Sequence, residues 1–312
     1  MKRFLSSRIA NFASRAACAA LCGGLLTATA QAAPLIGLYT FEGANGNFAN
    51  VVDASGNGKN PTFYEQGLVS VTTGGQGYQG EAAKFAPTGS WFNPAPNAAQ
   101  NSGGGFTVGI DISPSKGDLT IGGWLKLSPT SATTQNPKYT FFSHDDGCWD
   151  RGLWLDAAAG NWQTTGGSNC TGPRNTGATM TLNDWHLVVV SMAGINASLY
   201  IDGVLKSTTV SDDYGTTAPD LRFGAFDRSG GTEPWEGLMD NLFVFSSALT
   251  AGQVSSINSD GLAGIQRVAG LAGDPSASVP EPSSLLLVAL AAGALGWSRR
   301  KPSALSSAQR SE

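Results

Sequence analysis

The densest group of side chains that could do chemistry lies between residues 141 and 170. Tryptophans, carboxylates and an arginine occur here between or beside two cysteines, beginning with the run FFSHDDGCWDRGLWLD. An indole ring stacks on a sugar ring through its apolar face, and carboxylates and a guanidinium hydrogen-bond to sugar hydroxyl groups. The pattern predicts a site for a glycan or matrix polymer made of Trp149, Asp150, Arg151, Trp154 and Trp162.

The three tryptophans of this group have a second interpretation. Large aromatic side chains are mostly buried in β-sandwiches, so these three could cover a disulfide and fill the core. In the run RGLWLD, Leu153 and Leu155 share one face of a strand, and Trp154 lies on the other face. If the leucines face the core, Trp154 points outward or into the groove of the sandwich. Among the other tryptophans, Trp124 and Trp185 are expected in the core, and Trp91 and Trp235 are left unassigned.

The sequence contains none of the common catalytic motifs. Of the 2 histidines, His186 lies in an apolar run that predicts a buried strand, and His144 is the one candidate acid–base imidazole. Gly-x-Ser-x-Gly, His-Glu-x-x-His and phosphate-loop patterns are missing. We therefore expect a protein that is not an enzyme. One alternative is a polysaccharide hydrolase using carboxylates of residues 145–156, at a separation of about 5–5.5 Å or about 6.5–9.5 Å. Another is a purely structural matrix protein without a small ligand.

Both ends of the chain carry export features. Residues 1–32 combine four basic residues, the apolar run Ala16–Leu26 and the triplet Ala30-Gln31-Ala32, which predicts a secretory signal peptide cut after Ala32. Near the other end, Leu285–Trp297 is uncharged but shorter than the roughly 20 residues of a comfortable spanning helix. The basic residues that follow it would stay on the cytoplasmic side. We expect export, with transient membrane insertion through a C-terminal hydrophobic helix.

Export also bears on the cysteines. Cys18 and Cys22 lie in the predicted signal peptide, which leaves Cys148 and Cys170. Two cysteines in an oxidising compartment most simply form a disulfide, and the alternative is two free thiols. A metal site at these cysteines is not expected, because the sequence has no Cys-x-x-Cys motif and no nearby pair of histidines.

The exported body is acidic. Residues 33–282 contain 11 basic and 22 acidic residues, so their formal net charge is 11 − 22 = −11. Such a field argues against nucleic acid and anionic membrane surfaces as partners. It also argues against a strongly acidic polysaccharide, unless a cation bridges the two.

The body reads as short strands between Gly, Asn, Asp and Ser turns. Strands are expected at 35–41, 82–86, 119–127, 185–191, 221–226 and 237–245, and a closing helix at 248–258. A hairpin is expected over Asn196–Val210, with Asp202-Gly203 as its type I′ turn. Antiparallel strands without helical crossovers predict an all-β, two-sheet jelly-roll sandwich. The predicted order is signal peptide 1–32, jelly roll 33–262, linker 263–279, sorting segment 280–301 with its hydrophobic part 283–297, and tail 302–312.

The sorting segment resembles the PEP-CTERM signal of Gram-negative bacteria. The resemblance rests on Pro280-Glu281-Pro282, the short apolar span and the basic cluster that contains Arg299 and Arg300. It implies an exosortase-type protease as a processing partner and a final location at the cell surface or in the extracellular matrix. Such signals usually end near the basic cluster, whereas 302–312 follow here.

Seven segments of the body occur in an order similar to that of the laminin-G-like, concanavalin A-like jelly roll of bacterial surface proteins. They are LYTFEG, DASGNGKN, GYQGEAAKFA, LTIGGWLKL, WHLVVVSMAG, ASLYIDGVLKST and WEGLMDNLFVFSSALTAGQV. The resemblance implies the fold first, because members bind sugars or proteins or form accessory domains of glycosidases. The Glu-x-Asp-x-x-Glu strand of laminarinase-like glycosidases is missing here.

The second resemblance also implies a structural calcium ion. In that family the ion lies between the DASGNG turn, an early acidic position and the late strand, which match Asp53, Glu42 and Asp240. Asn57 in the same turn adds a further oxygen ligand of the kind that Ca²⁺ prefers. The alternative is an ordinary turn that needs no ion.

Overall fold

The computed structural model of the protein describes residues 32–64, 68–87, 104–129, 138–144, 150–165, 172–210, 220–225 and 233–271. The predictions for the signal peptide, Trp91, Trp149, the Cys148–Cys170 disulfide and the sorting segment with its hydrophobic helix lie outside these ranges. None of the helices within them combines the length and apolar character needed to span a bilayer.

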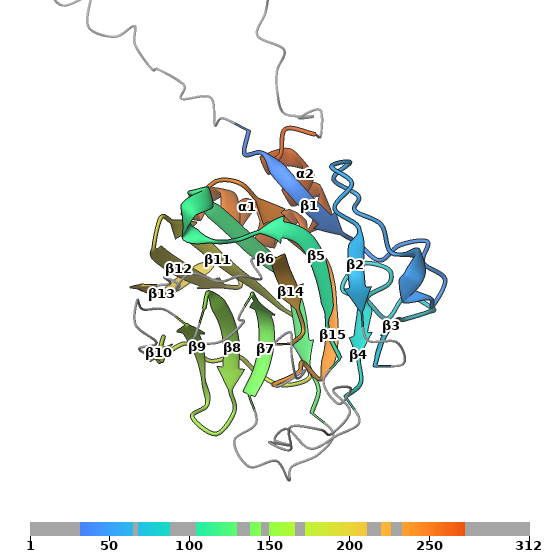
Figure 1. Ribbon diagram of the computed structural model, residues 1–312, viewed down its shortest axis with the longest axis horizontal. Helices are drawn as coiled ribbons and strands as arrows, with labels where there is room; N and C mark the ends of the chain where they lie inside the picture. Colours follow the sequence, from blue (N-terminus) through green and yellow to red (C-terminus); the bar gives the residue numbers. More distant parts are fainter. Residues whose placement is uncertain are drawn as a thin grey trace, which may run out of the picture. The chain divides into compact units, whose positions relative to one another are not determined.

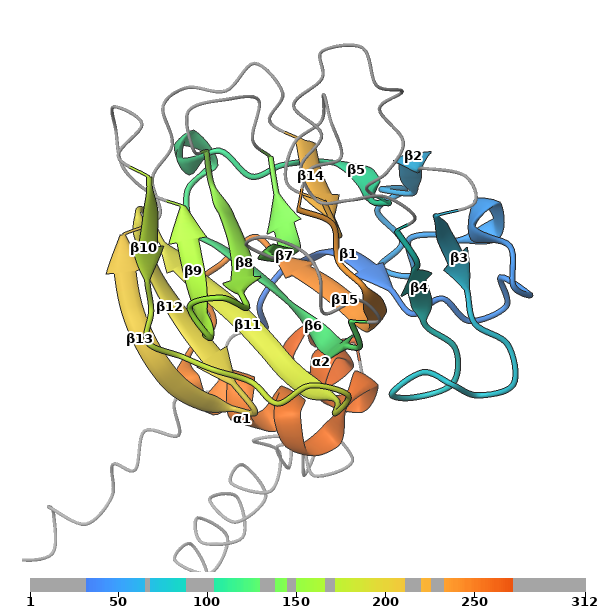
Figure 2. The same ribbon diagram turned by 90° about the horizontal axis from the view of Figure 1, so that it is seen from below.

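Two antiparallel sheets form the domain (Figures 1 and 2), which confirms the predicted all-β, two-sheet class. The larger sheet has the order β13-β12-β11-β6-β15-β4-β3, and β1 pairs with β15. Its strands are β1 (Leu35–Tyr39), β3 (Val69–Val71), β4 (Ala83–Phe85), β6 (Leu119–Leu127), β11 (His186–Ala193), β12 (Asn196–Ile201), β13 (Val204–Val210) and β15 (Gly237–Phe245). The predicted hairpin is present as β12 and β13, and its turn residues Asp202 and Gly203 both have positive φ, 52° and 77°.

The smaller sheet has the order β10-β9-β8-β7-β14-β5-β2. Its strands are β2 (Pro61–Tyr64), β5 (Phe106–Asp111), β7 (Lys138–Ser143), β8 (Gly152–Asp156), β9 (Asn161–Thr165), β10 (Pro173–Asn175) and β14 (Asp220–Phe223). Two single-turn 3-10 helices, Phe48–Asn50 and Pro114–Lys116, lie in connections.

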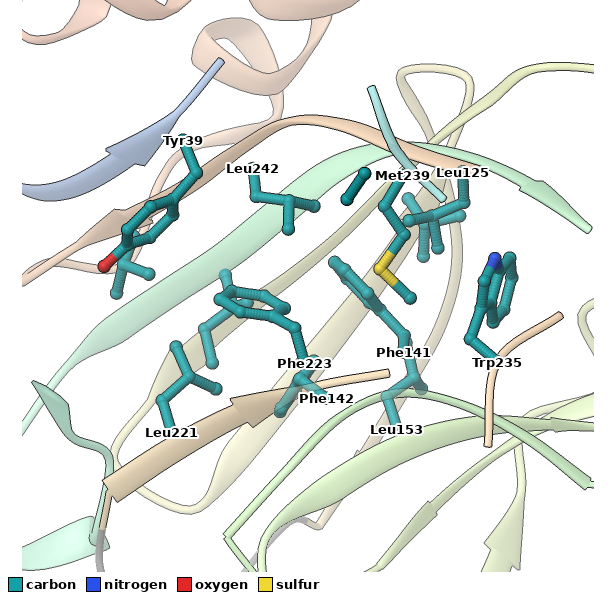
Figure 3. Packing of buried hydrophobic residues seen from close by; sticks show 14 of the residues in the cluster. Tyr39, Leu125, Phe141, Phe142, Leu153, Leu221, Phe223, Trp235, Met239 and Leu242 are labelled. Atoms are coloured by element: carbon teal, nitrogen blue, oxygen red, sulfur yellow. The ribbon is translucent and has the colours of Figure 1, made fainter. Parts of the chain in front are cut away.

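The main core lies between the facing sheets (Figure 3). Leu125 and Met239 of the larger sheet meet Phe141, Leu153 and Phe223 of the smaller sheet within one buried cluster. Because alternate residues of a strand point to opposite faces, every second residue of β6 and β15 is left on the outer face of the larger sheet. That outer face therefore needs a cover of its own.

Two helices cover part of this outer face, α1 (Ala251–Asp260) and α2 (Leu262–Val268) (Figure 2). Thr250 caps α1 in a capping box with Gln253, and Ile257, Ile265 and Val268 join a second buried cluster. The predicted linker over 263–279 therefore begins later than expected. The apolar residues Ile265 and Val268 pack against the sheet, so the domain continues through α2.

Strand β15 changes partners halfway along its length. Residues 237–239 pair with β4, residues 242–245 pair with β1, and the pairing with β6 shifts register between Asp240 and Phe243. Asn241 adopts a φ of 45° at this irregularity. Asp240 and Asn241 thus lie at a gap between two partner strands, where a loop or a ligand can reach them.

Candidate functional site

A tight turn of residues 77–81 fills the gap beside Asp240. The turn is closed by a bond from Gly77 N–H to the Gly80 carbonyl, at 2.7 Å. Gln79 N–H donates to Asp240 Oδ2 at 2.9 Å, and Glu81 N–H donates to Glu42 Oε1 at 2.7 Å. The turn therefore holds two carboxylates, one from β15 and one from the segment after β1, on its backbone N–H groups.

The surroundings of Asp240 shift the pKa of its carboxyl group. Burial raises the pKa of Asp240 to about 7, and the charge of Glu42 adds to the increase, although N–H groups of Gln79, Asn241 and Tyr78 act in the opposite direction. The side-chain oxygen of Asn241, which is 1% exposed, accepts no hydrogen bond. A partly uncompensated carboxylate pair beside an unpartnered amide oxygen offers the hard oxygen ligands that suit Ca²⁺.

The structure does not bring the four predicted calcium ligands together. Asp53 is occupied elsewhere, because Oδ1 accepts from the N–H groups of Leu38 and Ser55 and Oδ2 accepts from that of Lys59. These bonds, together with one from the Ser55 side chain, outweigh burial and lower the pKa of Asp53. Asn57 donates to the Leu35 carbonyl at 2.9 Å. Within the described ranges, no group of three or more His, Cys, Asp or Glu side chains is placed to hold a metal ion.

Gly80 makes the contact between the turn and Glu42 possible, and its substitution tests this part of the site. Its φ is +84°, and a Cβ atom there would lie 2.0 Å from Glu42 Oε1. We expect Gly80→Ala to lower the free energy of unfolding by about 2 kcal/mol, from backbone strain plus displacement of the carboxylate. Gly56→Ala is the matched control, since its φ is +83° and nothing lies within 4 Å of its added Cβ. Equal losses in the two variants, measured by denaturant unfolding, would contradict the contact.

The four described residues among the five predicted to bind a glycan do not share one surface. Trp149 lies outside the described residues, and Asp150 is buried. Trp162 is fully buried in the main core, stacked near Trp235 with ring centroids 6.4 Å apart. Arg151 is also fully buried, and its guanidinium donates to two loop carbonyls. Trp162 therefore has a packing role, and Arg151 has a bridging role in the folded chain.

Trp154 differs from the others in the face it occupies. Leu153 and Leu155 belong to the main core, whereas Trp154 belongs to neither buried hydrophobic cluster. It therefore lies on the outer face of the smaller sheet, where Thr140 and Gln163 are its cross-strand partners. Its side chain is nevertheless 0% exposed, so its indole face is closed in this structure.

Polar side chains surround this indole ring. The Lys138 ammonium lies 5.8 Å from the ring centroid and 2.9 Å from Glu233 Oε1. Gln163 Nε2 donates to Asp156 Oδ2 at 3.2 Å. We call this group, made of Lys138, Trp154, Asp156, Gln163 and Glu233, the Trp154 cluster. Glu233 is far from β7 in sequence. A hydrogen bond of 3.1 Å from Thr140 N–H to the Glu233 carbonyl holds it beside that strand.

The Trp154 cluster is partly accessible to solvent and contains side chains of both charges. The side chains of Lys138 and Glu233 are 20% and 21% exposed, and Asp156 and Gln163 are half-buried. Burial raises the pKa of Glu233, the Lys138 charge opposes that increase, and the Asp156 charge adds to it. One cation, two carboxylates and an amide thus offer both hydrogen-bond donors and acceptors, which matches the hydroxyl groups of a sugar.

Neither histidine completes a catalytic constellation with the Trp154 cluster. His144 is buried. His186 begins β11, and its ring nitrogens lie 2.8 Å from Asp202 Oδ2 and 2.7 Å from Thr181 Oγ1. These two bonds tie the turn before β11 to the β12–β13 turn, a structural role that the apolar sequence context did not indicate.

Comparison with known proteins agrees with this fold. The sequence matches the concanavalin A-like lectin/glucanases superfamily over residues 100–255 and the PEP-CTERM protein-sorting motif over residues 278–301. No curated protein matches.

Several solved structures are similar. Domain 4 of the extracellular arabinanase AbnA from Geobacillus stearothermophilus, solved with arabinotriose, is 19% identical with a TM-score of 0.49, and the match covers 73% of this chain and 100% of that one. The botulinum neurotoxin serotype D binding domain is 15% identical with a TM-score of 0.49, over 72% of this chain and 51% of that one. The binding domain of Paraclostridial Mosquitocidal Protein 1 is 15% identical with a TM-score of 0.49, and the match covers 72% of this chain and 52% of that one.

The chain spans about half the length of the two toxin domains. The superfamily match extends over half of the present chain, and the two facing antiparallel sheets have the architecture expected of that superfamily. The protein belongs to the concanavalin A-like lectin/glucanases superfamily and carries a PEP-CTERM sorting motif at its C-terminal end.

Proposed function

We propose that this protein is an exported, non-enzymatic surface protein that binds a glycan or matrix polymer through the Trp154 cluster. The observation that carries the proposal is the convergence of Lys138, Asp156, Gln163 and Glu233 on one outer face of the smaller sheet. The half-exposed polar side chains contact sugar hydroxyl groups, and the buried indole below them fixes their positions.

The sorting motif supports the location of this activity. Residues 278–301 match the PEP-CTERM motif, and the predicted signal peptide lies at the opposite end of the chain. An exosortase-type protease processes the tail after transient membrane insertion, and the domain is then released or attached at the surface of a Gram-negative cell. A polymer outside the cell is the partner to which such sorting gives access.

Calcium is a structural cofactor in this proposal. Glu42, Asp240 and the unpartnered oxygen of Asn241 would hold the ion through hard oxygen ligands. A bound divalent cation would neutralise the two carboxylates and fix the turn of residues 77–81.

Binding of the purified full chain to exopolysaccharide isolated from the producing bacterium tests the proposal. Each of Lys138→Met, Glu233→Gln and Gln163→Ala removes a hydrogen-bonding group with little change in the fold. We expect each to weaken binding about tenfold, as for the loss of one hydrogen bond that involves a charged or polar group. Affinity electrophoresis or calorimetry gives the ratio, and no new reducing ends should appear during incubation.

Lys116→Met is the matched control for Lys138→Met. It breaks the Lys116–Asp111 ion pair of 3.2 Å, in which the lysine side chain is 59% exposed. Unchanged affinity in the three cluster variants, or an equal loss in the control, would refute the assignment of the site. Release of reducing ends that stops in Glu233→Gln would favour the hydrolase instead.

A further inference from the structure

A second set of exposed and half-buried side chains lies on the outer face of the larger sheet, beside the area covered by α1 and α2. In this part of the sheet Leu238 of β15 pairs with Lys84 of β4 on one side and with Lys126 of β6 on the other. Cross-strand partners point to the same face, so the two ammonium groups flank Leu238. With strands about 4.8 Å apart, the two lysines are anchored roughly 10 Å from each other.

An aromatic platform adjoins the lysines. Trp124 lies two residues before Lys126 in β6 and so points to the same face. The Tyr78 ring stacks on Trp124, with centroids 4.6 Å apart and an interplanar angle of 14°, and Trp185 meets Tyr78 edge-on at 6.2 Å. Trp124 is buried, whereas Tyr78 is 37% exposed and Trp185 is half-buried. One face of Tyr78 is therefore covered by Trp124, and the exposed part of the ring is available to a ligand.

The two lysines have no polar partner in the described part of the chain. Among the described residues, neither the Lys84 nor the Lys126 ammonium takes part in an ion pair or hydrogen bond, and Lys84 is exposed. Asp240 shares this face as the partner of Trp124, but it is fully buried and bonded to backbone N–H groups of the 77–81 turn. Two unpaired ammonium groups are thus available to an anionic group of a ligand, on a body with a formal charge of 11 − 22 = −11.

We propose that this lysine–aromatic patch, made of Tyr78, Lys84, Lys126, Trp185 and Leu238, binds a polysaccharide that contains uronic acid. The exposed aromatic ring contacts the apolar C–H face of a sugar ring, and the lysines pair with sugar carboxylates. Two lysines are too few for nucleic acid, which needs an extended basic surface. The acidic body repels polymers of high charge density, so the patch suits a polymer that carries one carboxylate per sugar or fewer.

The patch and the Trp154 cluster lie on different sheets and share no residue. A chain with both sites holds two polymer segments at once, which makes it a cross-link in a matrix and raises its avidity for a polymer network. The two proposals can be tested independently. Substitutions in the Trp154 cluster leave the residues of the patch unchanged, and substitutions in the patch leave the Trp154 cluster unchanged.

Binding of the purified full chain to polygalacturonate, with neutral dextran as comparison, tests the patch. We expect Lys84→Gln/Lys126→Gln and Tyr78→Ala each to weaken polygalacturonate binding at least tenfold. Lys116→Gln/Lys206→Gln is the matched control, because it removes the same charge from two exposed lysines elsewhere and should change the affinity less than twofold. Glu233→Gln separates the sites and should leave polygalacturonate binding unchanged. Circular dichroism and melting temperature confirm that each variant folds.

Several outcomes would overturn the proposal. If the wild-type chain does not bind polygalacturonate, or binds dextran equally well, the patch has no preference for sugar carboxylates and the proposal is wrong. An equal loss in the Lys116/Lys206 control shows nonspecific charge attraction in place of a site. Vesicles of phosphatidylglycerol and phosphatidylcholine form a third arm. The patch is a membrane contact if the vesicles bind the wild-type chain but not the Lys84/Lys126 variant, while polygalacturonate binds both chains equally.

Discussion

The full chain is expected to melt at a clearly higher temperature at pH 5 than at pH 8 in calcium-free buffer. The reason is Asp240, whose pKa is about 7 in the folded chain against 3.8 for an ordinary aspartate. The folded state therefore binds a proton that the unfolded state releases between these two values, and stability falls as the pH rises from 4 to 7. The difference between pH 5 and pH 8 is about 3 kcal/mol, or roughly 6–12 °C in a domain of this size.

Asp240→Asn isolates this effect. The amide is neutral at every pH, so the variant should lose the part of the difference between pH 5 and pH 8 that Asp240 contributes. The contribution of Glu233, whose pKa is also raised, remains. Asp53 and Asp111 do not interfere, because their pKa values are lowered and they act only under more acidic conditions. Any other group that titrates in this range contributes to both curves and cancels in their difference. Parallel curves for the wild type and the variant would show that Asp240 is not the titrating group.

Calcium should remove the same pH dependence by another route. An ion between Glu42 and Asp240 favours the ionised carboxylates, so millimolar Ca²⁺ at pH 8 should raise the melting temperature of the wild type by several degrees, and EDTA should reverse the increase. Asp240→Asn should show little response. If Ca²⁺ has no effect while the pH dependence remains, the turn of residues 77–81 alone stabilises the carboxylate pair and the calcium prediction is wrong.

The sequence predicted the strands well where the pattern was local. The alternation over Leu119–Leu127 and the run Gly237–Phe245 matches β6 and β15, and Asp202-Gly203 marks the turn of the hairpin. Each of these elements is specified by residues within a few positions of each other, through side-chain period or turn chemistry. The same local argument placed Leu153 and Leu155 on the core face and Trp154 on the opposite face.

Local sequence patterns could not predict contacts between residues that are distant in the sequence. Glu233 reaches Lys138 across 95 positions of sequence, and Gln79 reaches Asp240 across 161. No motif marks either pair, since their proximity comes from the order of strands in the sheets. At Asp53 a local motif was present but had two interpretations. Its turn sequence suits a calcium ligand and also a carboxylate that accepts hydrogen bonds from backbone N–H groups. Only the contacts in the folded chain distinguish between them.

Arg151 shows most clearly how a residue suited to a ligand can have a structural role. It is 0% exposed, and its Nη1 and Nη2 groups donate to the carbonyls of Ile112, after β5, and Gly194, between β11 and β12, at 2.9 and 3.0 Å. One guanidinium thereby joins the chain before β8 to a loop of each sheet. A fixed planar fork makes this possible, and the ammonium of a lysine cannot reproduce it.

We therefore expect Arg151→Met to act on stability. Loss of two hydrogen bonds from a charged donor, with the Ile112 carbonyl left buried and the Gly194 carbonyl left partly buried, should cost about 3 kcal/mol and lower the melting temperature by roughly 6–12 °C. Arg151→Lys should fall in between. Arg174→Met, at an exposed position of β10, is the control and should stay within about 0.5 kcal/mol. The competing hypothesis, in which Arg151 binds the glycan, requires unchanged melting with lost affinity for the exopolysaccharide. That result would return Arg151 to the ligand site and would mean that the folded chain exposes a guanidinium that is buried here.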